Sequence, residues 1–199
     1  MLYRFPNKHA KMKARGGIIM NIWHDVSVER IQPDNFLACI EIPAGCKNKY
    51  ELDKKTGALI LDRILYTSTH YPQNYGFIPK TYAGDNDPLD VLVICSEPIV
   101  PLALVQCYPI GIVNMVDSGQ ADEKIIAVCA HDPIYSQYRE ISELPEHIFD
   151  EICHFFKVYK DLEKKNTQVL NIEGRQKAIE VVGRYIKEYD MHFGKKEKE

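Results

Sequence analysis

The chain has 199 residues, of which 45% are hydrophobic and 27% are charged, and its formal net charge is -3. This composition predicts one globular domain with a packed core. No apolar run approaches the ~20 residues that cross a bilayer, which argues against a membrane protein. The near-neutral charge argues against a nucleic-acid-binding protein.

The two ends differ from the rest of the chain. Residues 1–20 carry five basic residues and no acidic one, so the remaining residues carry a net charge of -8. We expect a basic, disordered extension here with Met20 as the natural start, an organelle transit peptide being the alternative. Residues 195–199 are expected to form a charged tail. A single domain is predicted over residues 21–194, because no repeat or linker interrupts them.

Strand-like segments come first along the chain and are separated by Pro and Gly rather than by helices. They cover residues 36–42, 49–52, 58–62, 91–95, 103–115 and 124–129. Short consecutive strands of this kind favour an antiparallel or barrel-like sheet over a doubly wound fold.

Helical periodicity appears only late. Pro145 can open a helix whose apolar residues recur at steps of three and four as far as Leu162, and a second helix is predicted over residues 178–189. The predicted fold class is therefore α+β, mainly β: a small closed barrel with two principal helices packed outside it.

The six cysteines include no C-x-x-C pair, and most of them lie in apolar runs such as residues 91–95. Thiols of this kind usually pack as small hydrophobic groups, so reduced core cysteines are favoured over disulfides. This pattern predicts a cytoplasmic protein.

The most distinctive chemical feature is the acidic segment 85–90, which places Asp85, Asp87 and Asp90 directly before an apolar strand. Residues i and i+2 of an extended chain face the same side, so the first two carboxylates can converge, and Pro88 can turn the third toward them. Oxygen ligands of this type suit Mg²⁺. A solvated Asp-rich turn is the alternative. A calcium loop of the EF-hand type does not fit, because the expected Gly and Glu are missing.

A second acidic pair, Asp117 and Asp122, brackets a predicted turn after a long apolar run. Lys124 lies two residues further on and would face the same side as Asp122. By itself this segment is a hairpin loop. Together with residues 85–90 it offers the two sets of carboxylates that a two-metal centre requires.

Charged residues also interrupt three strand-like segments, at Glu41, at Lys49 and Glu51, and at Asp62 with Arg63. Each could belong to an ion pair on a barrel wall. Together they suggest a polar cavity with both signs of charge. Four tyrosines between residues 66 and 82 could stack on bases, but hydroxyl groups that donate to phosphate or carboxylate oxygens fit the acidic surroundings better.

Several enzyme classes find no support. The chain has no phosphate-binding P-loop, no dinucleotide-binding glycine motif, no nucleophile elbow and no H-E-x-x-H zinc motif. Its seven histidines are dispersed. A zinc hydrolase or a serine hydrolase is therefore not indicated.

Six motifs, in this order and spacing, resemble those of the family I soluble inorganic pyrophosphatases of the bacterial type. They are IEIP at 40–43, KYE at 49–51, DR at 62–63, YPQNYG at 71–76, DNDPLDVLV at 85–93 and HFFKVYKDL at 154–162. The resemblance covers about residues 22–175. It departs from some bacterial members at Tyr108, where they carry Arg, and at Val158, where they carry His.

The resemblance implies a five-stranded OB-like barrel and the hydrolysis of pyrophosphate to two phosphates by direct attack of a metal-activated water. It implies several Mg²⁺ ions per active site, with Mn²⁺ or Zn²⁺ as substitutes. It also implies a homo-oligomer, with a hexamer favoured over a dimer or a trimer, and no nucleic-acid or membrane partner.

The family pattern also implies roles for individual residues. Asp87 would accept a proton from the attacking water, and Glu41 and Glu51 would hold metal-bound water. The direct metal ligands would be Asp85, Asp90, Asp117 and Asp122. The residues implied to bind phosphate oxygens are Lys49, Arg63, Tyr75, Lys124, Tyr159 and Lys160.

Two other functions remain open at this point. An OB-like barrel is also a nucleic-acid-binding fold, although the acidic charge argues against that use. A Mg²⁺-dependent phosphoesterase or nuclease for larger substrates would use the same acidic residues and would differ in the size of its pocket.

Overall fold

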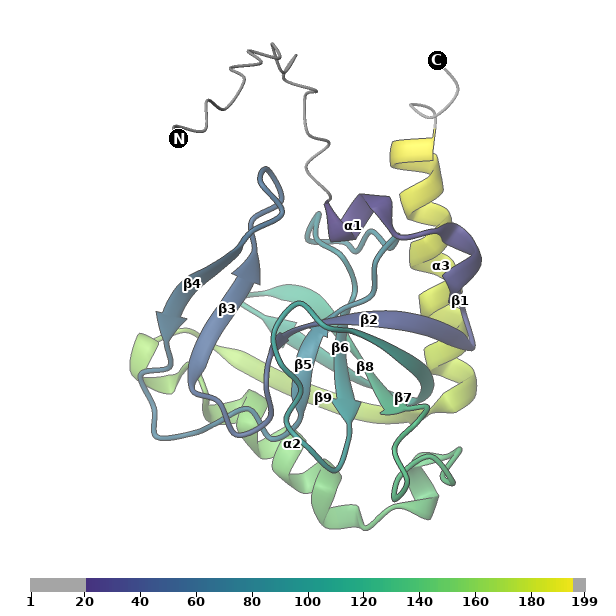
Figure 1. The fold of residues 1–199 in the computed structure, drawn as a ribbon. Coiled ribbons are helices and arrows are strands. Elements are labelled where there is room, and N and C mark those ends of the chain that lie inside the picture. The colour runs from purple at the N-terminus through teal and green to yellow at the C-terminus, as the bar shows by residue number, and fades with distance from the viewer. Residues whose placement is uncertain (1–20, 195–199) are drawn as a thin grey trace, which may run out of the picture.

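The structure is a computed structural model that describes residues 21–194, so the predictions for residues 1–20 and 195–199 lie outside it. A mixed sheet occupies the centre, α2 packs below it and α3 runs along one side in the view of Figure 1. The elements are α1 (Ile22–Asp25), the 3₁₀ turn η1 (Val28–Arg30), β1 (Ile31–Gln32), β2 (Asn35–Ile42), β3 (Asn48–Leu52), β4 (Leu59–Ile64), β5 (Asn74–Phe77), β6 (Asp90–Ile94), β7 (Leu104–Asp117), β8 (Gln120–Cys129), η2 (Ile141–Glu143), α2 (Glu146–Val158), η3 (Asp161–Glu163), β9 (Thr167–Gly174) and α3 (Arg175–Phe193).

The strands form two sheets. The larger one has the order β1-β2-β5-β6-β8-β7-β9, and β2 also pairs with β7. The pairings therefore lead from β2 through β5, β6, β8 and β7 and back to β2. Every pairing in this sheet is antiparallel except that of β6 with β8, which is parallel. The hairpin of β3 and β4 forms the second sheet.

Both faces of the central strands are buried, which explains their unbroken apolar sequences. Along β6, Val91 and Val93 belong to the core under α3, whereas Leu92 and Ile94 belong to the core under α2. Strands covered on both faces are apolar at every position rather than at every second one. The two helices supply the cover, α3 with residues such as Val182 and α2 with residues such as Phe156.

The prediction of a mainly β fold with two principal helices is confirmed, and the six predicted strands are present. Five of them differ from the prediction by one or two residues at an end, whereas β8 begins at Gln120, four residues before its predicted start. The first helix was predicted to continue to Leu162, but it ends at Val158. The 3₁₀ turn η3 follows, and Lys164, directly after it, takes a left-handed φ of 57°. The second extends further than predicted, over Arg175–Phe193. Helix α1 and the strands β1, β5 and β9 were not predicted.

Strand β5 lies very close to β2 at one glycine. A Cβ atom on Gly76 would lie 1.9 Å from the carbonyl oxygen of Cys39, far inside van der Waals contact. Only glycine allows the two strands to pair at this register, where Gly76 faces Ile40. The neighbouring residue Tyr75 is thereby fixed in the sheet.

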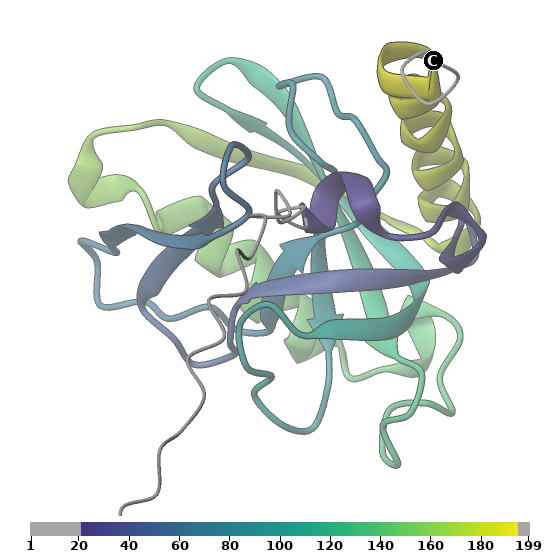
Figure 2. The same cartoon turned by 45° about the horizontal axis from the view of Figure 1, so that its top comes forward.

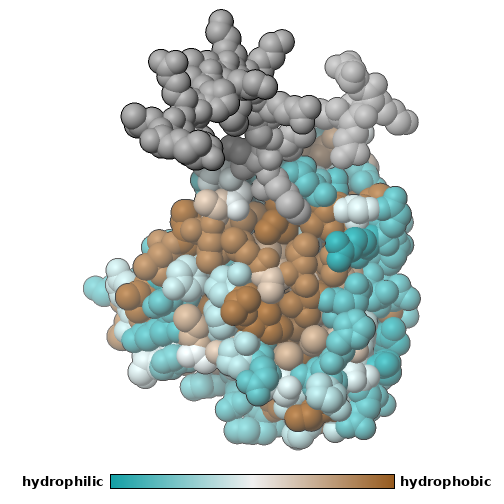
Figure 3. Space-filling model, in the orientation of Figure 1, coloured by the Kyte–Doolittle hydropathy of each residue, from teal (hydrophilic) through white to brown (hydrophobic). Residues whose placement is uncertain are grey.

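The surface is unevenly polar. In Figure 3 hydrophobic residues gather on the face over β2, whereas hydrophilic residues cover the side along α3. Large apolar side chains are also exposed on β4, at Ile60, Leu61 and Ile64. Among the helices of residues 21–194, none has the length and apolar character needed to cross a membrane. All six cysteines lie within this range, and their thiols are free.

Candidate active site

One cavity of about 210 Å³ collects charged side chains from five strands, a long loop and the end of α2. It is lined by Trp23, Glu41, Lys49, Tyr50, Glu51, Leu52, Lys54, Tyr75, Phe77, Asp85, Asp87, Pro88, Asp90, Asp117, Asp122, Lys124, Tyr159 and Lys160. Every predicted site residue except Arg63 is in this set. The structure therefore brings together twelve of the thirteen predicted residues, over a span of 120 positions in the sequence.

Strand geometry accounts for much of this convergence. Lys49 and Glu51 lie two residues apart on β3, and Asp122 and Lys124 lie two residues apart on β8. Residues with this spacing in a strand present their side chains to the same face. Asp90 begins β6 at the position that faces Lys124 across the parallel ladder.

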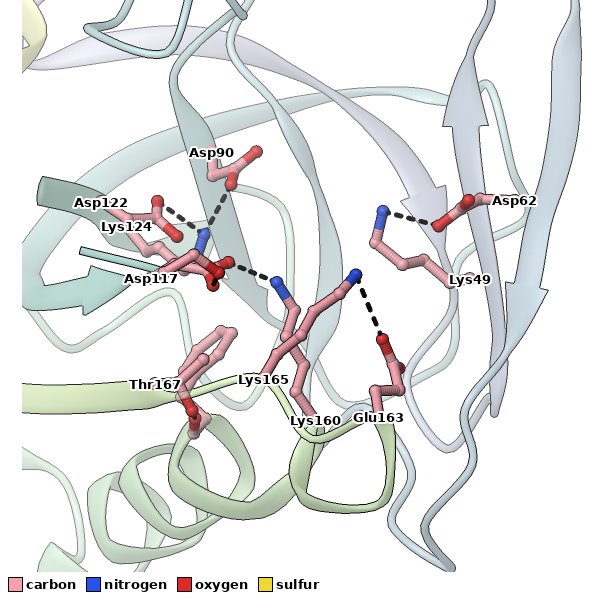
Figure 4. Close-up of polar contacts among 12 residues, drawn as sticks. Lys49, Asp62, Asp90, Asp117, Asp122, Lys124, Lys160, Glu163, Lys165 and Thr167 are labelled. Carbon is pink, nitrogen blue, oxygen red and sulfur yellow. Dashed lines mark hydrogen bonds and ion pairs between the residues drawn. The ribbon is translucent and has the colours of Figure 1, made fainter. Parts of the chain in front are cut away.

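Lys124 is the centre of the best-defined charge cluster. Its Nζ donates to Asp90 Oδ2 at 2.6 Å, to Asp122 Oδ1 at 2.9 Å and to the Tyr75 hydroxyl at 3.1 Å. The tyrosine hydroxyl in turn donates to Asp90. Burial alone would lower the pKa of the Lys124 ammonium, but the facing carboxylates outweigh burial and raise it. Lys124 is therefore a buried lysine whose charged form its neighbours favour (Figure 4).

A second cation lies at the end of α2. Lys160 Nζ forms an ion pair with Asp117 Oδ2, as Figure 4 shows. Burial tends to raise the pKa of Asp117, but hydrogen bonding to Lys160 outweighs it and lowers the pKa below its ordinary value. Tyr159 packs beside this pair, and its burial raises the pKa of its hydroxyl, which stays protonated and able to donate.

Glu41 is the most deeply buried carboxylate of the cavity, with 8% of its surface exposed. Its Oε1 accepts a hydrogen bond of 2.7 Å from the backbone N–H of Leu52. Burial raises its pKa to about 8, and the negative charge of Asp90 adds to the effect against the hydrogen bond from Leu52. In the absence of bound cations, Glu41 thus holds its proton more tightly than an ordinary glutamate does.

Lys49 and Glu51 form the ion pair that was considered for a barrel wall, and both also line the cavity. Lys49 lies 3.2 Å from Asp62 as well. Arg63 lies outside the cavity lining. It pairs with Asp62, and its Nε donates to Glu163 at 2.8 Å. Its Nη2 is buried without a hydrogen-bond partner among the described residues, which leaves one donor for an added acceptor.

Six lining residues were not among the predicted site residues, and two of them, Lys54 and Trp23, contact each other across the cavity wall. Lys54 lies in the turn after β3 and pairs with Asp87. It lies outside the strand, so the strand period gave no signal for it. Trp23, the single tryptophan of the chain, comes from α1, which the sequence pattern did not reveal.

The side chains that line the cavity supply mainly oxygen donors. Seven carboxylates line the cavity together with four lysines, and no thiol or imidazole is among the lining residues. Within residues 21–194 no group of three histidine, cysteine, aspartate or glutamate side chains is close enough together to hold a metal ion without further ligands. Mg²⁺ usually binds one or two carboxylates, keeps several waters and takes substrate phosphates as further ligands. The all-oxygen donor set therefore fits Mg²⁺ as a partly hydrated ion.

Comparison with known proteins identifies the family. The family model described as inorganic pyrophosphatase matches residues 38–190, which is well over half of the chain. The chain belongs to the family I soluble inorganic pyrophosphatases. The predicted resemblance and the prediction of an enzyme, an inorganic diphosphatase, are confirmed.

Individual members of the family are similar over nearly their whole length. The soluble inorganic pyrophosphatase 2 of Chlamydomonas reinhardtii is 47% identical over 178 residues, covering 89% of this chain and 92% of its own. The Thermus thermophilus pyrophosphatase structure has a TM-score of 0.82 and 37% identity, covering 86% of this chain and 99% of its own. The Helicobacter pylori pyrophosphatase structure has a TM-score of 0.78 and 40% identity, with coverages of 80% and 96%.

Proposed function

We propose that the chain hydrolyses inorganic pyrophosphate to two phosphates in a Mg²⁺-dependent reaction, by direct attack of water. The observation that carries this proposal is that twelve of the thirteen predicted residues meet in one cavity. Family membership supports it, because the similar proteins are named for this substrate.

We assign the metal to the aspartates, as the family pattern implies, with Asp85, Asp90, Asp117 and Asp122 as direct ligands. Several ions are needed, because seven carboxylates would otherwise repel a compact polyanion. When bound, Mg²⁺ supplies positive charge to the substrate phosphates and lowers the pKa of coordinated water. Mn²⁺ and Zn²⁺ are proposed as substitutes.

The remaining roles belong to the chain itself. Asp87 accepts the proton of the attacking water, and Glu41 and Glu51 orient water within the cavity. Basic and hydroxyl side chains bind the phosphate oxygens: Lys49, Arg63, Tyr75, Lys124, Tyr159 and Lys160. Lys124 and Lys160 are already charged and partly desolvated, so they need little reorganisation to stabilise the charge that develops on the leaving phosphate.

We also propose that β2, β5, β6, β8 and β7 form the closed OB-like barrel of a single domain over residues 21–194. The support is the pairing of β2 with both β5 and β7. A cytoplasmic homo-oligomer is proposed, with a hexamer favoured over a dimer or a trimer. The free thiols agree with a cytoplasmic location. The apolar side chains exposed on β4 agree with a contact between subunits.

Metal removal tests the mechanism. Enzyme treated with a chelator should lose pyrophosphate hydrolysis, and added Mg²⁺ should restore it. Acid-quenched enzyme should carry no phosphoryl group, because water attacks the substrate directly. Full activity without a divalent ion, or a phosphorylated enzyme that forms and decays at the rate of turnover, would contradict the proposal.

A further inference from the structure

Lys54 lines the cavity, and the family pattern gives it no role. It belongs to the turn between β3 and β4, and its ammonium forms an ion pair with Asp87 Oδ1. We propose that Lys54 is a further substrate-binding residue, whose ammonium binds an oxygen of the phosphoryl group that lies next to Asp87. This inference rests on the proposed function.

The contact between Lys54 and Asp87 is suited to exchange. The two side chains are 45% and 46% exposed, and ion pairs at such exposed positions contribute about 0–1 kcal/mol. A pyrophosphate oxygen carries a comparable charge and brings further negative charge beside it. The ammonium can therefore transfer from the carboxylate to the substrate at little cost.

Helix α1 holds the Lys54 turn in place through two contacts. The Asn21 side chain caps α1 by accepting from Trp23 N at 3.0 Å, and its Nδ2 donates to the carbonyl oxygen of Lys54 at 2.8 Å. The Trp23 ring lies 5.7 Å from the Lys54 ammonium, at the distance of a cation–π contact. In Figures 1 and 2 the β3–β4 turn reaches toward α1.

Trp23 is itself rigidly held. It is 4% exposed, its Nε1 donates to the carbonyl oxygen of Thr81 at 2.9 Å, and its ring packs edge-on against Phe193 at 5.5 Å. Asn21 and Trp23 precede residue 38, where the family match begins. They therefore lie outside the matched region. Their contacts with Lys54 make them positioning residues, which restrict where its ammonium can go.

The test compares Lys54→Met with Lys55→Met, a neighbouring exposed lysine outside the cavity lining. At fixed free Mg²⁺, Lys54→Met should raise KM for pyrophosphate roughly tenfold, or about 1.4 kcal/mol, with kcat within twofold of wild type. Lys54→Arg should restore most of the loss. Calorimetry with the non-hydrolysable analogue imidodiphosphate should give the same loss of affinity.

The outcomes separate this inference from the proposed function. Hydrolysis by wild type and Lys55→Met reports the proposed function, whereas the difference between Lys54→Met and Lys55→Met reports Lys54. Equal KM and equal analogue affinity in the two variants would overturn the inference. A fall in kcat at unchanged KM would also overturn it, because Lys54 would then act only through Asp87.

A double-mutant cycle tests the role of Trp23. Trp23→Leu should raise KM a few-fold in the wild-type background and should have no further effect in the Lys54→Met background, because the ammonium it positions is gone. Equal increases in both backgrounds would show that Trp23 does not act through Lys54.

Discussion

The Nζ atom of Lys124 lies 2.6 Å from Oδ2 of Asp90, and the two residues are direct partners in the parallel ladder between β6 and β8. Partners in a parallel ladder project on the same face of the sheet, so the pairing of two strands places this cation against this carboxylate. The sheet itself thus fixes part of the active site.

Removing the Lys124 ammonium should destabilise the protein. Lys124→Met leaves Asp90 and Asp122 without their buried counter-charge, which should cost about 3 kcal/mol of unfolding free energy in metal-free buffer. Urea unfolding measures the loss, with Lys55→Met as the exposed control.

Added Mg²⁺ should then stabilise Lys124→Met more than wild type, because the carboxylates have lost their competing cation. A variant as stable as the control, or indifferent to Mg²⁺, would show that the cluster does not depend on Lys124.

Asp87→Asn should separate proton transfer from metal binding. Loss of the proton acceptor should lower kcat by roughly a hundredfold or more, while Mg²⁺ binding largely persists, because Asp87 is not assigned as a main ligand. Steady-state kinetics and calorimetry measure the two quantities. Asp122→Asn is the comparison and should weaken Mg²⁺ binding. Wild-type turnover in Asp87→Asn would remove Asp87 from its proposed role.

Gly76→Ala should separate β2 from β5. The added Cβ would lie 1.9 Å from a backbone oxygen that cannot move without breaking the pairing, so we expect a loss of about 3 kcal/mol in unfolding free energy. Gly84→Ala is the matched control, since a Cβ there meets nothing within 4 Å. Similar melting temperatures for the two variants would contradict the close approach.

Asp132 provides a stability test away from the active site. Burial would raise the pKa of this carboxyl, but backbone hydrogen bonds from Ser96, Tyr135 and Ile134 outweigh burial and hold it well below its ordinary value. Such a group stabilises the fold fully above its unfolded pKa of about 3.9, and the stabilisation is lost as the pH falls toward the folded pKa.

Asp132→Asn should therefore cost about 2 kcal/mol at pH 7 and leave kcat unchanged. The difference from wild type should shrink progressively below pH 4. Unfolding free energies measured between pH 2.5 and 7 follow this change, with the exposed Asp150→Asn as control. A difference that is constant across this range would contradict the assigned hydrogen bonds.

The sequence was informative where chemistry and strand period coincide. The two-residue spacing between Lys49 and Glu51, and between Asp122 and Lys124, predicts that each pair shares a face. The structure places all four side chains at the cavity. The unbroken apolar runs of β6 and β8 predict strands that are covered on both faces, as the structure shows. These features depend on local geometry alone.

Features that depend on distant contacts were not predictable. Strand β5 lies in a Tyr- and Asn-rich segment, and its pairing relies on the close approach of Gly76 to β2. Trp23 and Lys54 meet at the cavity because α1 packs against the β3–β4 turn, which no spacing in the sequence reveals. The position of Arg63 outside the cavity lining follows from its pairing with Glu163, a hundred residues later.

The rate of phosphate release from pyrophosphate, compared with ATP and a nitrophenyl phosphate ester under the same Mg²⁺ concentration, tests the central claim most directly. A cavity of about 210 Å³ lined by cations and carboxylates should accept pyrophosphate and exclude the larger substrates. We predict a kcat/KM for pyrophosphate at least a hundredfold above that for either alternative. Equal or greater activity on ATP or the ester would contradict a site built for pyrophosphate.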